Sequence, residues 1–273
     1  MAIGRHTLEQ LTAEKLLDWA ISTFGRSMAI CTSFQNEGMV LLDMAARIDP
    51  SVRVITLDTG RLPEETHHMI ELVRQRYGVV VETVFPEAAD VESMVRLHGP
   101  NVFYQGVSHR LLCCHVRKVL PLERKMREFL ASVVGLRRTQ SDSRADLRKV
   151  EDNDGRLKLS PLADWTAAGV EGYLRRHDVP QHPLYGRGYT SIGCAPCTRA
   201  TRADEQERAG RWWWEQGAAK ECGIHYLPNG KARRQFDVLL EEVRAATRSG
   251  FPAGVPLPPP ASEVESALEP VLR

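Results

Sequence analysis

Short segments that are apolar throughout alternate with helical segments in the first half of the chain, and this alternation restricts the fold more than any other feature. Four segments have the length and composition of buried strands: residues 27–33, 52–57, 79–85 and 131–135. Residues 38–47 and 63–77 have the pattern of helices. Apolar strands that alternate with helices are typical of a parallel sheet covered on both faces. The sequence therefore predicts an α/β fold.

The loops after the predicted strands are the candidate binding loops, because parallel sheets bind ligands beyond the carboxyl ends of their strands. Residues 33–38, 58–61 and 135–141 are rich in groups that bind phosphate or ribose. The first loop opens a helix, so its backbone N–H groups and the helix dipole can hold an anion. It lacks the lysine and glycine spacing of ATP-hydrolysing and dinucleotide-binding loops. The pattern predicts nucleotide binding without ATP hydrolysis, and an ordinary strand-to-helix turn is the alternative.

The overall composition excludes several classes of function. The 273 residues are 42% hydrophobic and 26% charged, as expected for a soluble globular protein. A formal net charge of +1 argues against nucleic acid as the partner, and no apolar run approaches the roughly 20 residues that span a bilayer. The chain begins without a secretory apolar segment, so we expect a cytoplasmic, reducing location.

Arginines concentrate around the cysteine-bearing segments. They are Arg137, Arg138, Arg144, Arg199, Arg202, Arg208 and Arg211. Such a cluster favours a small, highly anionic ligand, although each arginine taken singly could equally lie on a solvated helix face.

Five of the six cysteines divide into four candidate ligands and one candidate nucleophile. Cys113, Cys114, Cys194 and Cys197 could bind a tetrahedral zinc ion or an iron–sulfur cluster. Adjacent side chains on a helix diverge by about 100°, which favours the wider four-iron cluster over one small ion. Buried structural thiols or disulfides are the alternative, and a reducing compartment makes disulfides improbable. Cys222 remains as the nucleophile.

Six motifs, taken in order, resemble those of the sulfonucleotide reductases. They are Leu-Asp-Thr-Gly at 57–60, Cys-Cys at 113–114, Gly-Leu-Arg-Arg-Thr-Gln-Ser at 135–141, Gly-Cys-Ala-Pro-Cys-Thr-Arg at 193–199, Gly-Arg-Trp-Trp-Trp-Glu at 210–215 and Lys-Glu-Cys-Gly-Ile-His at 220–225. The four-cysteine set is similar to the iron–sulfur branch, the assimilatory adenosine 5'-phosphosulfate reductases. The resemblance covers residues 10 to 226. It implies a Rossmann-like sheet of adenine nucleotide alpha hydrolase type, flanked by helices and followed by a C-terminal arm and tail.

The resemblance also implies an activity. Cys222 would take the sulfuryl group of adenosine 5'-phosphosulfate, release AMP, and yield sulfite when a second thiol attacks it. The remaining cysteine, Cys31, lies in a predicted strand and is expected to be core. The reducing thiol should therefore come from another protein, which the resemblance implies is thioredoxin or glutaredoxin. One 4Fe-4S cluster with a structural and electrostatic role is expected, with no flavin or nicotinamide cofactor.

Site residues follow from the same motifs. Lys118 lies four residues after Cys114, hence on the same helical face, where its ammonium could neighbour both cluster sulfurs and substrate oxygens; a solvated lysine is the alternative. The expected substrate-binding residues are Ser33, Asp58, Thr59, Gly60, Arg137, Arg144, Arg208, Arg211 and His225. The family pattern puts Arg208 and Arg211 at the anionic end of the substrate. The three tryptophans at 212–214 fit a core or a subunit interface better than a site wall.

The sequence also predicts a division into two parts and leaves several rival functions open. We expect a reductase domain over residues 1–228, and a charged amphipathic helix at 231–248 with a Pro-rich tail over 229–273, without the CxxC of a fused thioredoxin domain. The tail could serve an oligomer contact, and a homo-oligomer is expected. Rival functions are a reductase of 3'-phosphoadenosine 5'-phosphosulfate and a non-catalytic, metal-stabilised nucleotide-binding module. A cluster-dependent nucleic-acid thiolation enzyme would need an ATP-splitting loop that the chain lacks.

Overall fold

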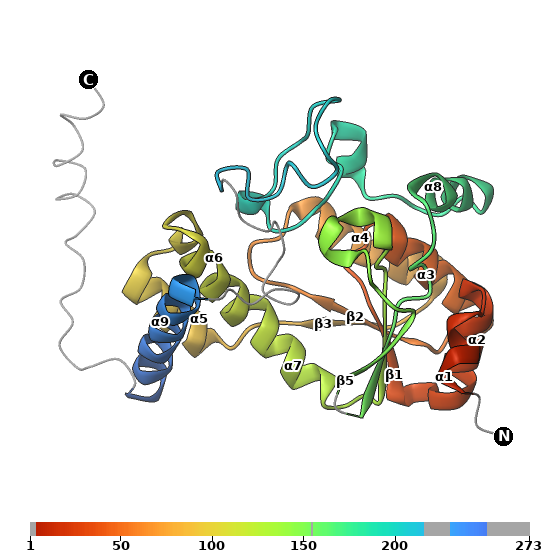
Figure 1. The fold of residues 1–273 in the computed structure, drawn as a ribbon, viewed down its shortest axis with the longest axis horizontal. Coiled ribbons are helices and arrows are strands. Elements are labelled where there is room, and N and C mark those ends of the chain that lie inside the picture. The colour runs from red at the N-terminus through yellow and green to blue at the C-terminus, as the bar shows by residue number, and fades with distance from the viewer. Residues whose placement is uncertain (1–3, 154, 216–229, 250–273) are drawn as a thin grey trace.

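The computed structural model describes residues 4–153, 155–215 and 230–249 and is built on one six-stranded sheet (Figure 1). The strand order is β3-β2-β1-β4-β6-β5. The strands are β1 (Met28–Cys31), β2 (Arg53–Leu57), β3 (Val81–Val84), β4 (Ala131–Val134), β5 (Val150–Asn153) and β6 (Arg156–Leu159). Strands β1 to β4 are the four predicted from the sequence, and they pair in parallel. The predicted α/β fold is confirmed.

Nine α-helices accompany the sheet within the described residues. They are α1 (Arg5–Glu9), α2 (Ala13–Phe24), α3 (Asn36–Ile48), α4 (Glu64–Tyr77), α5 (Ala88–His98), α6 (Val107–Cys114), α7 (Leu120–Met126), α8 (Ala167–Arg176) and α9 (Gly230–Ser249). Helices α3, α4 and α9 correspond to the three predicted ones. A π-helical turn, His115–Val119, joins α6 to α7. None of the helices described here is long and apolar enough to cross a membrane.

Alternate residues of the strands enter two different cores, as the period of two in a strand requires. Met28, Ile30 and Val54 face the larger core, which α2, α3, α4 and α8 also build. Ala29 and Ile55 face the opposite side, where the end of α7 and the segment after it complete a smaller core. Because both faces are covered, the polar loops gather at the ends of the strands.

The edge of the sheet departs from the sequence-based expectation. Strand β6 runs parallel to β4, but β5 pairs antiparallel with β6, so the sheet is mixed rather than wholly parallel. Both strands are short and rich in charged residues, which hides them from a search for apolar segments. Helix α1 holds this edge, because the Glu9 carboxylate accepts hydrogen bonds from the backbone N–H groups of Lys149 and Val150 at 3.0 Å each.

A separate core joins the C-terminal helix to the cysteine-bearing helix. Helices α5, α6 and α9 lie side by side at one end of the molecule (Figure 1). Phe236, Leu239, Leu240 and Val243 of α9 pack in the same cluster as Leu112 of α6 and the cysteines at 194 and 197. The predicted amphipathic helix at 231–248 is confirmed, and its apolar face rests on the elements that carry the cysteines. The predicted domain boundary at residues 228/229 remains a prediction.

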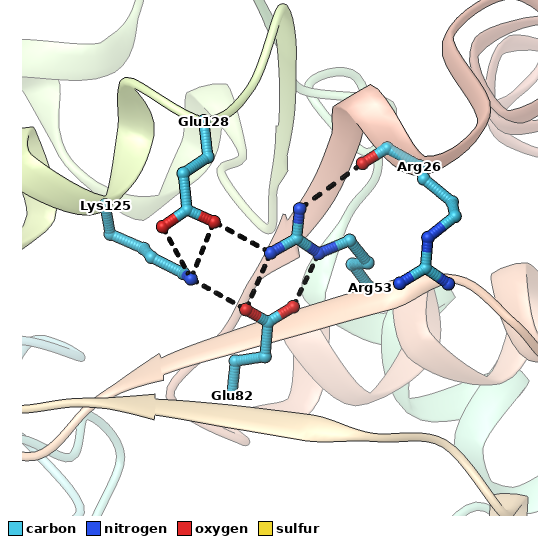
Figure 2. A network of polar contacts seen from close by, with 5 residues as sticks. All are labelled: Arg26, Arg53, Glu82, Lys125 and Glu128. Carbon is cyan, nitrogen blue, oxygen red and sulfur yellow. Dashed lines mark hydrogen bonds and ion pairs between the residues drawn. The ribbon is translucent and has the colours of Figure 1, made fainter.

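Four charged side chains form one network on the side of the sheet that α7 covers (Figure 2). Arg53 of β2 makes a bidentate contact with Glu82 of β3 at 2.6 and 2.8 Å and also reaches Glu128 at 2.9 Å. Lys125 of α7 contacts both carboxylates at 2.8 Å. Because β2, β3 and α7 each supply a member, the network ties the helix to the sheet.

The network should make the free energy of unfolding depend on pH in the acid range. The Arg53 guanidinium, with help from Lys125, lowers the pKa of Glu82 to about 2. A carboxylate with a lowered pKa in the folded state stabilises the fold above its unfolded pKa, and this contribution is lost as the pH falls towards the folded pKa. We expect Glu82→Gln to cost about 1 kcal/mol at pH 7. The difference from the parent should close between about pH 5 and pH 2. Urea unfolding across that range measures it, and a constant difference would contradict the prediction.

Candidate active site

A cavity of about 600 Å³ opens at the carboxyl ends of β1, β2 and β4. The strand order reverses direction between β1 and β4, and open α/β sheets bind ligands at such a switch point. The volume suits a nucleotide-sized ligand. All three loops predicted as binding loops contribute to its lining, so the sequence located the cavity correctly.

The first loop is held in a fixed shape by contacts with its neighbours. Phe34 is fully buried with φ of 56°, and its backbone N–H donates to Thr32 Oγ1 at 2.9 Å. Gln35 Oε1 accepts a hydrogen bond from the Ile192 backbone N–H at 2.8 Å, which links the loop to the cysteine-bearing segment. Helix α3 begins at Asn36, so its N-terminus faces the cavity, where the N–H groups of its first turn favour an anion.

Arg137 is buried and paired with carboxylates. Its Nε lies 2.7 Å from Glu37 Oε1 in α3, and its Nη2 lies 3.5 Å from Glu207 Oε2. Burial raises the pKa of Glu207 above its ordinary value. Because the two carboxylates largely neutralise the guanidinium, Arg137 reaches the cavity as a positioned hydrogen-bond donor rather than as a free cation. Glu37 and Glu207 line the same cavity.

Gly135 allows β4 and α3 to approach closely. A Cβ atom at this position would lie 2.9 Å from both Glu37 Cβ and the Gly38 backbone nitrogen. We expect Gly135→Ala to cost about 1–3 kcal/mol of unfolding free energy through overpacking, and to weaken AMP binding because the loop must move. Urea denaturation and calorimetric AMP titration test both effects. Gly172→Ala in α8 is the matched control, since a Cβ there meets no atom within 4 Å, and equal losses in the two variants would contradict the prediction.

The four candidate ligand cysteines line a second, smaller cavity beside the first. Cys113 and Cys114 end α6, and Cys194 and Cys197 flank a 3₁₀ turn. Lys118 lies in the π turn after α6 and lines both cavities, which fits its predicted place between cysteines and substrate. The side chains are thus gathered as the sequence predicted, whereas their roles remain a matter for proposal.

The charges around these thiols are unequal. Burial opposes ionisation of Cys194, but the Lys118 ammonium and a 3.3 Å hydrogen bond shared with Thr59 Oγ1 help to hold the pKa of this thiol below its ordinary value. Burial and neighbouring thiols raise the pKa of Cys113 and Cys197 to about 12. A bound iron or zinc cation would stabilise the thiolates and so favour their ionisation. None of the four takes part in a disulfide.

The chemistry of the donor set fits an iron–sulfur cluster, because four thiols from two segments line one cavity and thiolates are the ligands of such clusters. Within the described residues, no group of three or more His, Cys, Asp or Glu forms a metal site as it stands. The cluster is therefore a matter for proposal.

Arg211 connects the two cavities, since its side chain lines both. The guanidinium is buried, and Nη1 donates to the Ile192 carbonyl oxygen at 3.1 Å. Gly193 leaves the room for it, because a Cβ there would lie 2.2 Å from Arg211 Nη2. Arg208 lines the nucleotide-sized cavity but not the cysteine cavity. This arrangement places guanidinium groups where the end of a ligand would approach the cysteines.

The structure brings together most, but not all, of the predicted substrate-binding residues. The cavity lining includes Ser33, Thr59, Arg137, Arg144, Arg208 and Arg211. Asp58 and Gly60 do not line it: the Asp58 carboxylate accepts hydrogen bonds from the Gly60 backbone N–H and from His67 Nε2, each at 2.8 Å. Both therefore shape the loop that presents Thr59. Cys222 and His225 fall outside the described residues.

Three polar residues of the cavity were not predicted as site residues, although one of them, Glu37, lies within the predicted binding loop 33–38. Tyr185, whose pKa burial raises, accepts a hydrogen bond from the Asn36 backbone N–H at 3.4 Å. Glu37 and Glu207 hold Arg137. A glutamate in the first turn of a helix is a weak hint of a capping role, but nothing local marks a contact with an arginine a hundred residues away.

Comparison with known proteins agrees with this geometry. Residues 27–200 match the model of the phosphoadenosine phosphosulfate reductase domain. An adenosine 5'-phosphosulfate reductase of Burkholderia cepacia is 47% identical over 196 residues, covering 71% of this chain and 78% of the relative. One from Allochromatium vinosum is 45% identical over 212 residues, covering 77% and 80%.

A solved structure supports the same relationship. The phosphoadenylyl-sulfate reductase from Candida auris, solved as a phosphate complex, aligns with a TM-score of 0.61 and 25% identity, covering 73% of this chain and 99% of that one. The domain match spans well over half of the 273 residues, and the relatives are similar over most of their length. The chain therefore belongs to the phosphoadenosine phosphosulfate reductase domain family.

Proposed function

We propose that this protein reduces adenosine 5'-phosphosulfate to sulfite and AMP. The observation that carries the proposal is the meeting of a nucleotide-sized cavity with a four-cysteine cavity at Lys118 and Arg211, which line both. The names of the relatives support the same substrate. A sulfonucleotide bound with its nucleotide part at the switch point would direct its anionic end towards these two cations.

The reaction would proceed in two thiol steps. The Cys222 thiolate attacks the sulfur of the substrate, an S–S bond forms, the S–O bond to the phosphate breaks, and AMP leaves. A thiol of an external dithiol protein then attacks Cys222 Sγ and expels sulfite, and the second thiol of that protein resolves the mixed disulfide. The dithiol supplies two electrons and ends as a disulfide. Thioredoxin or glutaredoxin fits this chemistry.

The external donor is needed because none of the chain's described thiols is suited to resolve Cys222. Cys31 ends β1 and lines the nucleotide-sized cavity, but burial raises the pKa of its thiol to about 12, so it is a poor nucleophile. The other four described cysteines form the candidate ligand set. Cys222 would therefore act without a resolving partner from its own chain.

Cations suppress the repulsion between a thiolate and the sulfate oxygens and stabilise the departing phosphate. Lys118 and Arg211, which line the cavity, would meet the sulfate end, and the N-terminus of α3 would meet the phosphate. Cys113, Cys114, Cys194 and Cys197 would hold a 4Fe-4S cluster, which supplies cationic charge for the thiolates and fixes the Cys194 turn beside the substrate. No electron needs to pass through it.

The decisive experiment is a single turnover. Anaerobically purified protein is mixed with adenosine 5'-[³⁵S]phosphosulfate without reductant, and peptides are analysed by mass spectrometry. A sulfonate on Cys222 and one equivalent of AMP are expected. Addition of reduced thioredoxin should then release labelled sulfite. If no adduct forms on protein with its iron intact, the mechanism is wrong.

A second candidate substrate is 3'-phosphoadenosine 5'-phosphosulfate, which the name of the Candida auris neighbour favours. The two substrates differ by one phosphate, and the four-cysteine set favours the unphosphorylated one. Measuring kcat/KM with each nucleotide under the same thioredoxin concentration separates them. A higher value for the 3'-phosphorylated substrate would replace the first proposal by the second.

A further inference from the structure

A buried ion pair lies next to the four cysteines and outside the nucleotide-sized cavity. Arg110 Nε in α6 is 2.7 Å from Glu215 Oε1, and the side chains are 0% and 4% exposed. Arg110 lines the cysteine cavity but not the nucleotide-sized one, and Glu215 lines neither. Such a pair is expensive to desolvate, and apolar replacement of both partners is often neutral or stabilising. Stability alone is therefore a weak reason for its presence.

The pair reaches the nucleotide-sized cavity through one aromatic ring. The Arg110 guanidinium carbon lies 4.5 Å from the centroid of the Trp212 ring, and the Arg211 guanidinium carbon lies 4.6 Å from the same centroid. Trp212 is 1% exposed and has φ of 42°, a strained value for a bulky residue. One indole thus holds the guanidinium groups of Arg110 and Arg211, with the Arg208 guanidinium carbon farther away at 6.0 Å from the same centroid. The surrounding contacts keep the indole in a costly backbone conformation.

Electrostatics explains why the carboxylate is needed. Two guanidinium groups on one buried ring repel each other in a medium of low dielectric constant. The Glu215 carboxylate neutralises Arg110, so that Arg211 keeps its position over the ring and its hydrogen bond to Ile192. Without that charge, Arg110 would push Arg211 away from the point where the two cavities meet.

We propose that the Arg110–Glu215 pair is a positioning element for Arg211, and through it for the terminal anionic group of the substrate. The inference rests on the proposed function for the identity of that group. Arg110 and Glu215 do not touch the substrate; they act through the Trp212 ring. Their loss should therefore weaken recognition of the terminal group and leave recognition of the adenosine and first phosphate unchanged.

Two stable nucleotides separate these effects without catalysis. ADP carries a second phosphoryl group where the proposed substrate carries its sulfonyl group, whereas AMP ends at the first phosphate. The ratio of the AMP to the ADP dissociation constant therefore reports the contacts of the terminal group alone. Isothermal titration of the iron-loaded protein measures both constants.

The first variant is Glu215→Gln, which keeps the shape and an acceptor oxygen but removes the charge. We expect its ADP dissociation constant to rise about 10- to 100-fold, the worth of a hydrogen bond to a charged group, with AMP binding unchanged. In turnover, KM for the sulfonucleotide should rise and iron content should match the parent. Arg110→Lys keeps the charge but lacks the plane that stacks on Trp212, and it should shift the ratio in the same direction.

A double variant tests the charge argument. Arg110→Met with Glu215→Leu replaces the pair by apolar groups and should recover the thermal stability lost in Glu215→Gln. It lacks the plane that stacks on Trp212, as Arg110→Lys does, but it leaves no cation to push Arg211, so its AMP to ADP ratio should be higher than that of Glu215→Gln. A ratio no higher than that of Glu215→Gln would overturn the proposal, and so would unchanged ADP binding in both Glu215→Gln and Arg110→Lys.

Glu82→Gln is the matched control, because it removes a carboxylate from another arginine pair that lines neither cavity. It should leave the AMP to ADP ratio at the parent value, and an equal shift in this control would count against the proposal. The proposed function has its own test. If ADP binding depends on this pair but the parent protein forms no sulfonate on Cys222, the positioning role stands and the reductase assignment is wrong.

Discussion

Replacing Cys222 with serine is expected to lower sulfite formation by roughly 10⁴-fold or more, the largest effect of any substitution considered. A hydroxyl is far less ionised than a thiol near neutral pH and forms no S–S bond, so the sulfuryl group has no acceptor. Nucleotide binding should survive, because Cys222 is required only for attack. Sulfite release with thioredoxin and calorimetric AMP binding measure the two properties.

Cys31→Ala is the control for loss of a thiol that lines the nucleotide-sized cavity but is not proposed to react. Burial raises the pKa of this thiol to about 12, and its sulfur lies 4.0 Å from the sulfur of Met126 in the smaller core. We expect the Cys31→Ala protein to form the sulfonate on Cys222 as the parent does. Sulfite production by Cys222→Ser at more than a few per cent of the parent rate would contradict the assignment of the nucleophile.

Replacing Lys118 with alanine is expected to lower kcat by about 10²- to 10³-fold, the usual cost of removing one group that stabilises charge in the transition state. The ammonium lines both cavities and is among the groups that lower the pKa of Cys194. The four thiols stay in place, so iron and sulfide content should equal the parent value. Steady-state kinetics and iron analysis of the same preparation give both numbers.

Lys125→Ala is a matched control for Lys118→Ala, since Lys125 lies seven residues later on the same run of helix but takes part in the Glu82 network. It should reduce stability while kcat stays near that of the parent. Equal kcat in Lys118→Ala and the parent would remove Lys118 from the reaction. Loss of iron in Lys118→Ala would instead assign the lysine to holding the cluster.

The sequence predicted the elements that build the larger part of the sheet, because their signals are local. Strands β1 to β4 are mostly apolar, and the loops after β1, β2 and β4 could be assigned to one end of the sheet from the rule for parallel strands. Strands β5 and β6 could not be found in this way. Their charged residues suit a solvated edge, and only the pairing of β6 with β4 and of β5 with β6 reveals them as strands.

The site could be predicted as far as motif spacing reaches. Cys113 and Cys194 were expected at one place and do line one cavity. The pairing of Arg137 with Glu37 and that of Arg110 with Glu215 could not be predicted, since these partners are 100 and 105 residues apart. Contacts of this kind depend on the tertiary fold, and no local pattern carries them. Asp58 was predicted to bind substrate from its motif, but its carboxylate instead accepts hydrogen bonds that shape the loop.

The position of α9 against α6 has a consequence for how the protein is made. Ribosomes release the chain from its N-terminus at about 5–20 residues per second, so the sheet, complete at Leu159, is available several seconds before α9 ends at Ser249. From the synthesis of Cys197 until α9 is complete, the apolar face around Leu112, Cys194 and Cys197 lacks Phe236 and its neighbours. Iron delivered to the nascent chain in this interval would reach an open face, whereas iron delivered after α9 has packed would reach a covered one.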